Sequence, residues 1–377
     1  MKTKIYSLAF MAAALLCSCN ASTQSNGQDQ AKQDVAQPTK LAPYLFEITL
    51  DEYADSVPKD ALEKATVEFG CSAVRNGNYY GRNLDFFVSE VSEFIVRTTA
   101  KEGRHASLGV ARLFQMTDKE IEAGLTKEMI DLIPWGMFDG INDAGLVCNM
   151  NVVPVEDAGE LHTSPNPGKP EINCTFLVRA LLDKCATVDE AVEFINNHDV
   201  TGMNKGGFDL HFMIADPEKT VVVEYIDNKA VIKEQNIMTN FFVNRDKLAP
   251  KSDGVERYDI LKANYAEGGE SMEGMWNLLK RVRYSLSYDT DVKPFWKTEY
   301  LGNSNYTIDT PVDSILADAS YQEAFKNFKH YKETGEYKPE WKLWFTTHNS
   351  VYDIKEHKLW VTIRENYDKH YEFALTK

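Results

Sequence analysis

The sequence predicts an α+β protein in which mostly antiparallel strands and separate blocks of helices form layers. Two observations support this prediction. Short segments that alternate between apolar and polar residues recur along most of the chain, and helical spacing of apolar residues is confined to separate blocks. With 377 residues, of which 43% are hydrophobic and 26% charged, the chain can form one large core or two modest ones.

Turn-forming residues separate the predicted elements from one another. The predicted strands are residues 44–50, 69–75, 78–85, 93–99, 106–114, 145–153, 209–215, 220–226, 229–233, 344–347, 350–354 and 358–365. The predicted helices are residues 58–68, 118–125, 175–185, 188–196, 256–265 and 272–283. Residues 210–215 and 220–225 are joined by Asp-Pro-Glu-Lys and form a clear hairpin.

A second hairpin surrounds Cys71. If Asn76 and Gly77 form a two-residue turn of the mirror-image type, Cys71 stands directly opposite Arg82. Directly opposed residues share one face, with Cβ atoms about 5 Å apart, so the hairpin places a guanidinium beside a thiol. In a regular strand Asp85 points to the other face.

The charge of the chain excludes some partners. The net charge is −16, with 41 basic against 57 acidic residues and no basic block, which argues against nucleic acid. A negative surface also gives no general attraction to anionic lipids, so any membrane attachment is expected at the N-terminus.

The cysteines point to neither disulfides nor metal. Cys174 and Cys185 lie in a stretch with helical spacing, where eleven residues span about 16 Å, beyond the reach of a disulfide. We therefore expect buried thiols. No Cys and His cluster has zinc spacing and no Gly-x-Ser-x-Gly elbow occurs, so no metal, cofactor or common serine chemistry is expected.

The N-terminus reads as an export signal. Lys2 and Lys4 precede the apolar run 5–16, which is too short to span a bilayer. Residues 16–19, Leu-Cys-Ser-Cys, resemble a bacterial lipobox, which implies a signal peptide at 1–19, lipidation of Cys19 and anchoring in the periplasm or cell envelope. A plain signal peptide is the alternative. Residues 20–42 are expected to be a polar tether.

Several motifs resemble the choloylglycine hydrolase family, which includes bile salt hydrolases and penicillin V acylases, and the related acid ceramidase and N-acylethanolamine amidase group. The first are Cys-Ser-Ala-Val at 71–74 and Gly-Arg-Asn-Leu-Asp-Phe at 81–86. The others follow in family order at 139–146, Asn149 and Asn151, 238–240, 257–261 and 350–353. The resemblance covers nearly all of residues 71–377 and implies a four-layer αββα N-terminal-nucleophile (Ntn) hydrolase fold.

The resemblance implies a cysteine amidase made as a precursor. Cleavage between Gly70 and Cys71 would give Cys71 a free α-amine as its base, leave residues 43–70 as propeptide, and make 71–377 the catalytic domain. By resemblance Asp85 holds this amine and Arg82 supports the thiol, since a nearby cation favours thiolate. The alternative for both charged residues is a surface ion pair near a turn.

The remaining expected site residues serve the oxyanion and the acyl group. By resemblance Asn240 and Asn151 are donors to the oxyanion, although Asn149 shares a strand face with Asn151 and stays open. Arg257 completes the site. Two aromatic residues are expected to line an acyl pocket, with core packing as the alternative: Phe86 and Trp135.

The expected function is hydrolysis of a linear acyl-amide bond in a bile salt, a penicillin V or an N-acyl amide. Two other functions stay open: a surface lipoprotein that binds a ligand without catalysis, and an acyltransferase on the same fold. The expected partner is a small acyl-amide substrate, and a homo-oligomer stays open.

Overall fold

The computed structural model describes residues 35–57, 70–87, 90–112, 114–154, 164–203, 208–244, 253–284, 312–336, 338, 341, 344–364 and 366–375. The predicted signal segment with Cys19, most of the predicted tether and the helix predicted at 58–68 lie outside the described residues. None of the helices in the described ranges has both the length and the apolar character needed to cross a membrane.

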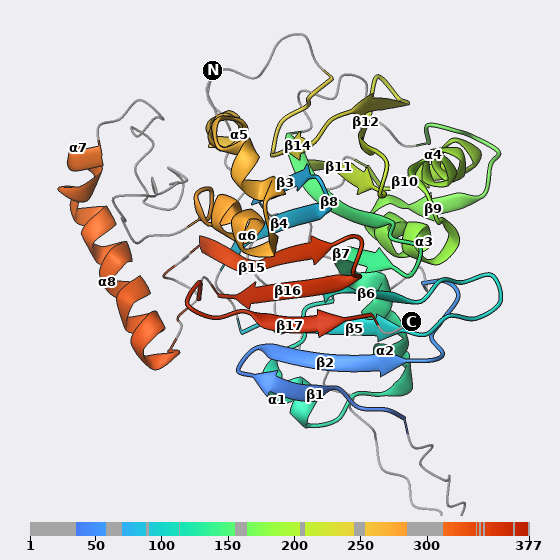
Figure 1. Cartoon of the computed structure of the whole chain (residues 1–377). Helices are drawn as coiled ribbons and strands as arrows, with labels where there is room; N and C mark the ends of the chain where they lie inside the picture. Colours follow the sequence, from blue (N-terminus) through green and yellow to red (C-terminus); the bar gives the residue numbers. More distant parts are fainter. Residues whose placement is uncertain are drawn as a thin grey trace, which may run out of the picture. The chain divides into compact units, whose positions relative to one another are not determined.

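One central layer is a nine-stranded sheet, here sheet A (Figure 1). Its order is β1-β2-β5-β6-β7-β8-β11-β12-β13, and its neighbours are antiparallel except for β2 and β5. The strands are β1 (Thr39–Ala42), β2 (Leu45–Leu50), β5 (Glu93–Thr98), β6 (Ser107–Ala111), β7 (Met137–Asn142), β8 (Val147–Pro154), β11 (Phe208–Ala215), β12 (Thr220–Ile226) and β13 (Lys229–Glu234).

The other central layer is a six-stranded antiparallel sheet, here sheet B, with the order β14-β3-β4-β15-β16-β17. Its strands are β14 (Ile237–Met238), β3 (Gly70–Asn76), β4 (Tyr79–Phe87), β15 (Trp344–Asp353), β16 (Lys358–Ile363) and β17 (Tyr371–Ala374). The strands predicted at 344–347 and 350–354 are one strand, β15, with a register shift between Thr346 and His348. Such a bulge interrupts the alternation, which explains why the pattern suggested two strands.

Helices cover the outer faces of both sheets. The helices of the described chain are α1 (Asp118–Glu122), α2 (Lys127–Leu132), α3 (Leu177–Lys184), α4 (Val188–Asn197), α5 (Asp253–Ala263), α6 (Met272–Lys280), α7 (Val312–Leu316) and α8 (Ala319–Thr334). Short 3₁₀ helices are η2 (Ile133–Gly136), η4 (Cys174–Phe176) and η6 (Tyr265–Gly269), and β9 (Glu171–Asn173) pairs with β10 (Asp199–Thr201).

Three apolar clusters separate four layers. The largest joins sheet A to α3 and α4, through residues such as Val223 and Leu181. A second lies between the sheets, where Val222 packs with Tyr352. A third joins sheet B to α6, through Val351 and other residues. The consecutive residues Val222 and Val223 of β12 thus enter different clusters, so this part of the strand is apolar on both faces rather than alternating. The predicted αββα architecture is confirmed.

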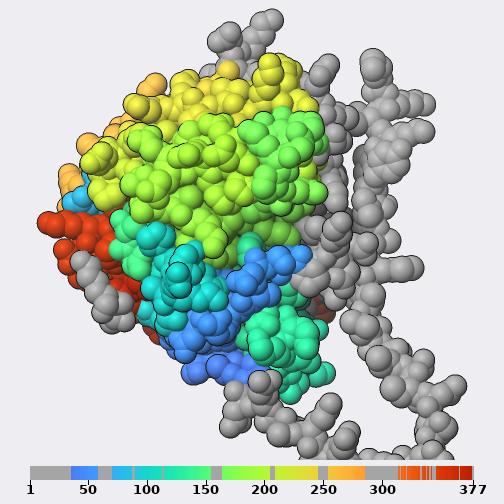
Figure 2. Space-filling model, turned by 90° about the vertical axis from the view of Figure 1, so that its right-hand side faces the viewer, coloured from blue at the N-terminus to red at the C-terminus, as the bar shows by residue number. Residues whose placement is uncertain are grey.

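The N-terminal part of the described chain belongs to sheet A. Residues 39–42, predicted as tether, form β1, and β2 lies within the predicted propeptide. β2 pairs in parallel with β5, and its Phe46 and Ile48 are buried. In Figure 2 this blue segment lies against the cyan and green parts of the chain.

Some elements had no clear sequence signal. β14 and β17 have only two and four residues. β7 contains Asp139 and Gly140, which obscure its apolar pattern, yet all six of its residues are buried. The prediction also omitted β1, the short pair β9 and β10, and the helices α2, α7 and α8.

Candidate active site

The turn of the β3–β4 hairpin lies one residue later than predicted. Gly77 and Asn78 form the turn, and Asn76 pairs with Tyr79. Gly77 has φ 58°, the positive value that a type II′ turn requires at its first central position. Every pair along the hairpin is therefore displaced by two residues.

The displacement changes the neighbour of Cys71 but not its face. Cys71 pairs with Leu84, and Ala73 is opposite Arg82, so the predicted direct pairing of Cys71 with Arg82 is wrong. Because side chains alternate with a period of two, Arg82 still points to the face that carries Cys71. Its long side chain reaches diagonally, and Nη2 lies 3.1 Å from Cys71 Sγ.

Arg82 is fixed by several partners in the space between the sheets. Nη2 also donates to the carbonyl of Met150 at 3.1 Å, and Nη1 donates to Asp139 Oδ2 at 3.0 Å. The guanidinium lies 5.3 Å from the centre of the Phe138 ring. Arg82, Asp139 and Cys71 are fully buried. The guanidinium is thus aimed at the sulfur by a carboxylate and a carbonyl from sheet A.

Burial dominates the ionisation of the thiol. It raises the pKa of Cys71 to about 11, although the charge of Arg82 acts in the opposite direction. Asp85 raises this pKa further, and Arg257 lowers it. In the uncleaved chain Cys71 is therefore a protonated thiol at neutral pH. The expected influence of Arg82 has the predicted sign but is smaller than the effect of desolvation.

Asp85 points to the other face of the hairpin, as its position in the strand predicted. Its Oδ1 accepts from the Thr346 hydroxyl at 2.6 Å, and its Oδ2 lies 3.4 Å from Arg257 Nη1. A Cβ on Gly70 would lie 3.3 Å from the Cβ of Asp85, so a larger residue at position 70 would crowd this side chain. Asp85 therefore lies beside the Gly70–Cys71 peptide without facing the thiol.

Arg257, from α5, gathers the backbone around the nucleophile. Its Nη1 donates to the Cys71 carbonyl at 2.6 Å and to Ser72 Oγ at 2.7 Å. Its Nη2 donates to Asn240 Oδ1 at 2.6 Å. Arg257 is fully buried. The structure thus brings Cys71, Arg82, Asp85, Asn240 and Arg257 together around one peptide.

Asn240 lies at the edge of the site. Its Oδ1 accepts from the Cys71 amide at 2.8 Å, and its Nδ2 donates to the Val152 carbonyl at 2.6 Å. The two donors on Oδ1, Cys71 N and Arg257 Nη2, fix the orientation of this amide. Since an amide NH₂ carries two hydrogens, the bond to Val152 uses only one of them.

Asn149 and Asn151 both point from β8 toward sheet B. Asn149 accepts from the Tyr80 hydroxyl and donates to Asn151 Oδ1 at 2.7 Å. Asn151 Nδ2 lies 3.5 Å from the carbonyl of Met238, in β14, which pairs with β3. Asn151 is therefore the one of the two that lies toward the strand edge where Asn240 binds the Cys71 amide, while Asn149 is held by Tyr80.

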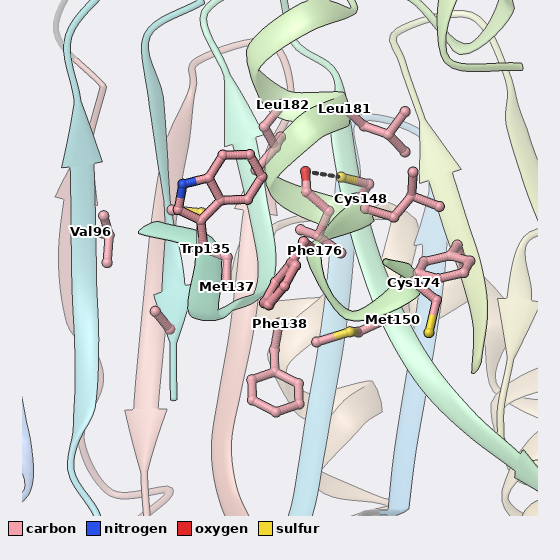
Figure 3. Close-up of a cluster of buried hydrophobic side chains, with 14 of the residues drawn as sticks. Val96, Trp135, Met137, Phe138, Cys148, Met150, Cys174, Phe176, Leu181 and Leu182 are labelled. Carbon is pink, nitrogen blue, oxygen red and sulfur yellow. Dashed lines mark hydrogen bonds between the residues drawn. The ribbon is translucent and has the colours of Figure 1, made fainter. Parts of the chain in front are cut away.

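The two predicted pocket residues belong to the large core cluster. Figure 3 shows Trp135 within it. Phe86 lies under the guanidinium of Arg112, 4.8 Å from ring centre to carbon. Trp135 packs edge-to-face on Phe176, with ring centres 6.1 Å apart, and its indole nitrogen donates to the Ala54 carbonyl at 2.7 Å. Both rings are almost completely buried. Their role as pocket residues stays a prediction.

The other described cysteines, Cys148, Cys174 and Cys185, are buried thiols, as predicted for Cys174 and Cys185. Cys148 Sγ donates to the Val178 carbonyl of α3, the dashed line in Figure 3. Burial raises the pKa of Cys185 to about 12. Within the described ranges, no group of three or more His, Cys, Asp or Glu residues is arranged to hold a metal ion.

The sequence reading missed several residues around Cys71. Ser72 binds Arg257, and Thr346 binds Asp85. On the other face, His348 contacts both Asp139 and Glu93. Polar residues inside otherwise buried strands were the available signal. For His348, the bulge hid the face on which the side chain lies.

The sequence model of the family described as acyl-coenzyme A:6-aminopenicillanic acid acyl-transferase matches residues 73–285, more than half of the chain. A penicillin V acylase of Pectobacterium atrosepticum is 33% identical over 112 residues, which cover 27% of this chain and 29% of that protein. The match thus spans less than a third of that relative's length.

Solved structures with similar folds include a mutant of conjugated bile acid hydrolase from Clostridium perfringens, with 17% identity, a TM-score of 0.40, and coverage of 81% of this chain and 92% of that one. Penicillin V acylase from Agrobacterium tumefaciens has 15% identity, a TM-score of 0.44, and coverage of 78% and 82%. The family model and the match to a penicillin V acylase confirm the predicted relationship with penicillin V acylases. The chain belongs to the acyl-coenzyme A:6-aminopenicillanic acid acyl-transferase family.

Proposed function

We propose that this protein is an Ntn amidase in which Cys71, freed by cleavage of the Gly70–Cys71 bond, attacks a linear acyl-amide bond. The observation that carries the proposal is the convergence on one residue: Arg82 contacts the sulfur, Asn240 binds the amide nitrogen and Arg257 binds the carbonyl of Cys71. A structural thiol needs no such arrangement around all of its polar atoms.

The precursor would cleave itself through its own thiol. Cys71 Sγ attacks the Gly70 carbonyl, and the thiol proton passes to the Cys71 nitrogen as the C–N bond breaks. Water then hydrolyses the resulting thioester, which leaves a carboxylate on Gly70 and a free amine on Cys71. The absence of a side chain at Gly70 suits this step, because a Cβ there would crowd Asp85 when the carbonyl turns toward the sulfur.

In turnover the new α-amine replaces the missing base. It accepts the proton of the thiol, and the thiolate attacks the acyl carbonyl of the substrate. The leaving amine takes a proton as the tetrahedral intermediate collapses, and water hydrolyses the acyl thioester. We assign support of the α-amine to Asp85, which contacts Arg257, and support of the Cys71 backbone to Arg257, which binds its carbonyl.

The oxyanion needs fixed donors close to Cys71. We assign this role to the second hydrogen of Asn240 Nδ2, with Asn151 as the further donor. Such a donor typically contributes about 3–4 kcal/mol to transition-state stabilisation. Asn149 fits less well because it is bound to Tyr80, whereas Asn151 lies toward the strand edge where Asn240 binds the Cys71 amide.

The acyl group could also pass to an amine instead of water, and the family description favours considering this second activity. Both reactions use the same acyl-enzyme. The test is product analysis by mass spectrometry with a bile salt, a penicillin V and a long-chain N-acyl amide, each with and without an added amine. Free acid in all samples indicates hydrolysis, and a new amide only with added amine indicates transfer.

Export and anchoring through lipidated Cys19 belong to the same proposal. The precursor and its product differ in mass, so intact-mass measurement tests the central step directly. A catalytic chain that begins at Cys71 supports the proposal. A purified protein that never cleaves and hydrolyses no member of the panel, even after its chain is freed at Cys71 by an external protease, contradicts it.

A further inference from the structure

A row of five charged side chains runs through the space between the two sheets and ends at Cys71. Its members alternate in sign and come from β4, β7, β15, β5 and the residue after β6: Arg82, Asp139, His348, Glu93 and Arg112. Successive members lie within hydrogen-bond distance of each other. All five side chains are at least 95% buried. Burial of these charges costs desolvation free energy unless every charge is paired, so the row suggests a specific task.

His348 occupies the middle of the row. Its Nε2 lies 3.0 Å from Asp139 Oδ2, and its Nδ1 lies 3.2 Å from Glu93 Oε2. A neutral imidazole has only one N–H, so it can satisfy one of these two carboxylates but not both. An imidazolium donates to both. A neutral ring could accept at Nε2 from Arg82 Nη1, 3.1 Å away, but it would then give Asp139 no hydrogen bond. Only the charged ring donates to both carboxylates, so the geometry favours it.

The surrounding charges agree with this geometry. Burial lowers the pKa of His348, but the charges of Glu93 and Asp139 and hydrogen bonds to both outweigh burial and place it above its usual value. Burial raises the pKa of Asp139, yet His348 and Arg82 together bring it below its usual value. Arg112 and His348 do the same for Glu93.

The number of charges in the row determines the net charge beside Cys71. With His348 protonated, three cations face two carboxylates, so one positive charge is in excess. Arg82 and His348 share the same oxygen, Asp139 Oδ2, and their nitrogens lie 3.1 Å apart. Arg82 Nη2 is directed away from this shared oxygen and toward Cys71 Sγ. A thiolate on Cys71 balances the excess charge.

The other groups around the row leave this balance intact. Ser350 and Tyr352 donate to Asp139 Oδ1, which leaves Oδ2 for the two cations. At the far end Arg364 adds a further positive charge near Arg112, and the neighbouring Tyr331 is neutral, so the excess of positive charge is not reduced. Tyr80, whose hydroxyl binds Asn149, lies within the electrostatic reach of Asp139 and Arg82. These tyrosines and the serine are neutral at physiological pH, so His348 is the member of the row whose charge can change there.

We propose that His348 is a positioning residue which, as a cation between Asp139 and Glu93, holds Arg82 against the Cys71 thiol and keeps one positive charge in excess beside it. The inference rests on the proposed role of Cys71 as nucleophile. The positioning role of His348 differs from a merely structural role because it predicts a change in the pKa of the Cys71 thiol.

The test compares His348→Gln with the unchanged protein, each expressed with a site at which an external protease frees Cys71. The rate of iodoacetamide labelling of the Cys71 peptide is followed by mass spectrometry across pH. We expect the labelling curve of His348→Gln to move to higher pH by about one unit, equal to about tenfold slower labelling at neutral pH. In substrate assays kcat should fall with little change in KM.

Two controls separate positioning from general damage. Asp183→Asn removes one partner of another buried pair, Arg179–Asp183, whose Nη2 and Oδ1 atoms are 2.6 Å apart, and should leave the Cys71 curve in place. In an Arg82→Gln background, His348→Gln should add almost nothing, because its effect passes through Arg82. If His348→Gln does not fold, His348→Asn removes the same positive charge and should shift the curve in the same direction.

An unchanged labelling curve in folded His348→Gln would overturn the inference, as would an equal shift in Asp183→Asn or a full additional shift in the Arg82→Gln background. Labelling needs no substrate. A protein whose Cys71 labels normally but hydrolyses no amide would therefore contradict the proposed function and still test the role of His348.

Discussion

The two faces of the β3–β4 hairpin carry charged groups with different tasks. On the inter-sheet face Arg82 contacts the sulfur of Cys71 and leads into the row through Asp139. On the helix face Arg257 binds the Cys71 carbonyl and also contacts Asp85, which lies beside the Gly70–Cys71 peptide. One strand residue thus receives two independent sets of contacts.

The difference teaches how a buried cysteine can be controlled. The inter-sheet face acts on Sγ, so its residues should alter thiol ionisation. The helix face acts on the backbone nitrogen and carbonyl, so its residues, together with Asn240 at the strand edge, should alter cleavage and transition-state stabilisation. Substitutions on the two faces should therefore change different measured quantities.

The largest effect is expected when the Cys71 side chain, which carries the proposed nucleophile, is removed. Cys71→Ala should abolish cleavage at Gly70–Cys71 and, in the chain freed by an external protease, lower kcat by about 10⁴-fold or more. The matched control is Cys148→Ala, another fully buried thiol, which should cleave and turn over normally. Intact mass and amide hydrolysis report the two effects. Full turnover by Cys71→Ala would refute the assignment of the nucleophile.

The next largest effect concerns Asn240. Because its amide is expected to donate to the oxyanion, Asn240→Ala in the protease-freed chain should lower kcat by about 10²-fold or more with little change in KM. The thiol labelling curve should stay close to that of the unchanged protein. Asn166→Ala, which loses a hydrogen bond to the His198 carbonyl far along the chain, is the control. A change mainly in KM would instead assign Asn240 to substrate positioning.

Substitution of Arg82, unlike that of Asn240, should change the pH dependence of thiol labelling. Arg82→Ala removes the cation 3.1 Å from the sulfur, so the pKa of the Cys71 thiol should rise further, by about one unit or more. The pH dependence of iodoacetamide labelling measures this rise. Arg75→Ala, on the same hairpin but bonded to carbonyls of the β11–β12 turn, should leave the curve in place. Equal curves for both variants would show that Arg82 is structural.

The site residues were predictable where a local motif carried them. A shift of two residues in hairpin register left Arg82 on the correct face, because side chains alternate with a period of two. The same alternation correctly placed Asp85 on the other face. The pairing itself was wrong because the residue that adopts positive φ, Gly77, begins the turn instead of ending it.

Residues that reach Cys71 through tertiary contacts were not predictable. His348 lies beyond a bulge in β15, and Glu93 begins a strand of the other sheet. Neither belongs to a local pattern that points to Cys71. The effect of burial on the thiol also depends on both sheets closing over it, so the sequence indicated the sign of the Arg82 contribution but not the outcome.

The smallest expected effect is that of cleavage itself on the integrity of the fold. Residues 35–57 lie before the cleaved bond, yet β2 pairs with β5 along six residues, and the hydroxyl of Tyr53 donates to Asp183 at 2.6 Å. The Tyr44 carbonyl accepts from the Glu93 amide at 2.9 Å, so the segment also supports the far end of the inter-sheet row. Each fully buried apolar side chain of the segment contributes roughly 1.5–3 kcal/mol to holding it in place.

We therefore expect the N-terminal fragment to stay bound after cleavage at Gly70–Cys71. Native mass spectrometry should show both chains in a one-to-one complex, and urea should separate them. Phe46→Asp, which places a charge in the core, should weaken retention, while Glu47→Gln on the same strand should not. In the variant that loses the fragment, thiol labelling should move to higher pH, since Glu93 loses the Tyr44 contact. Rapid loss of the fragment with an unchanged labelling curve would show that the inter-sheet face controls thiol ionisation without the fragment. A lipid on Cys19 could then no longer hold the catalytic chain at the membrane.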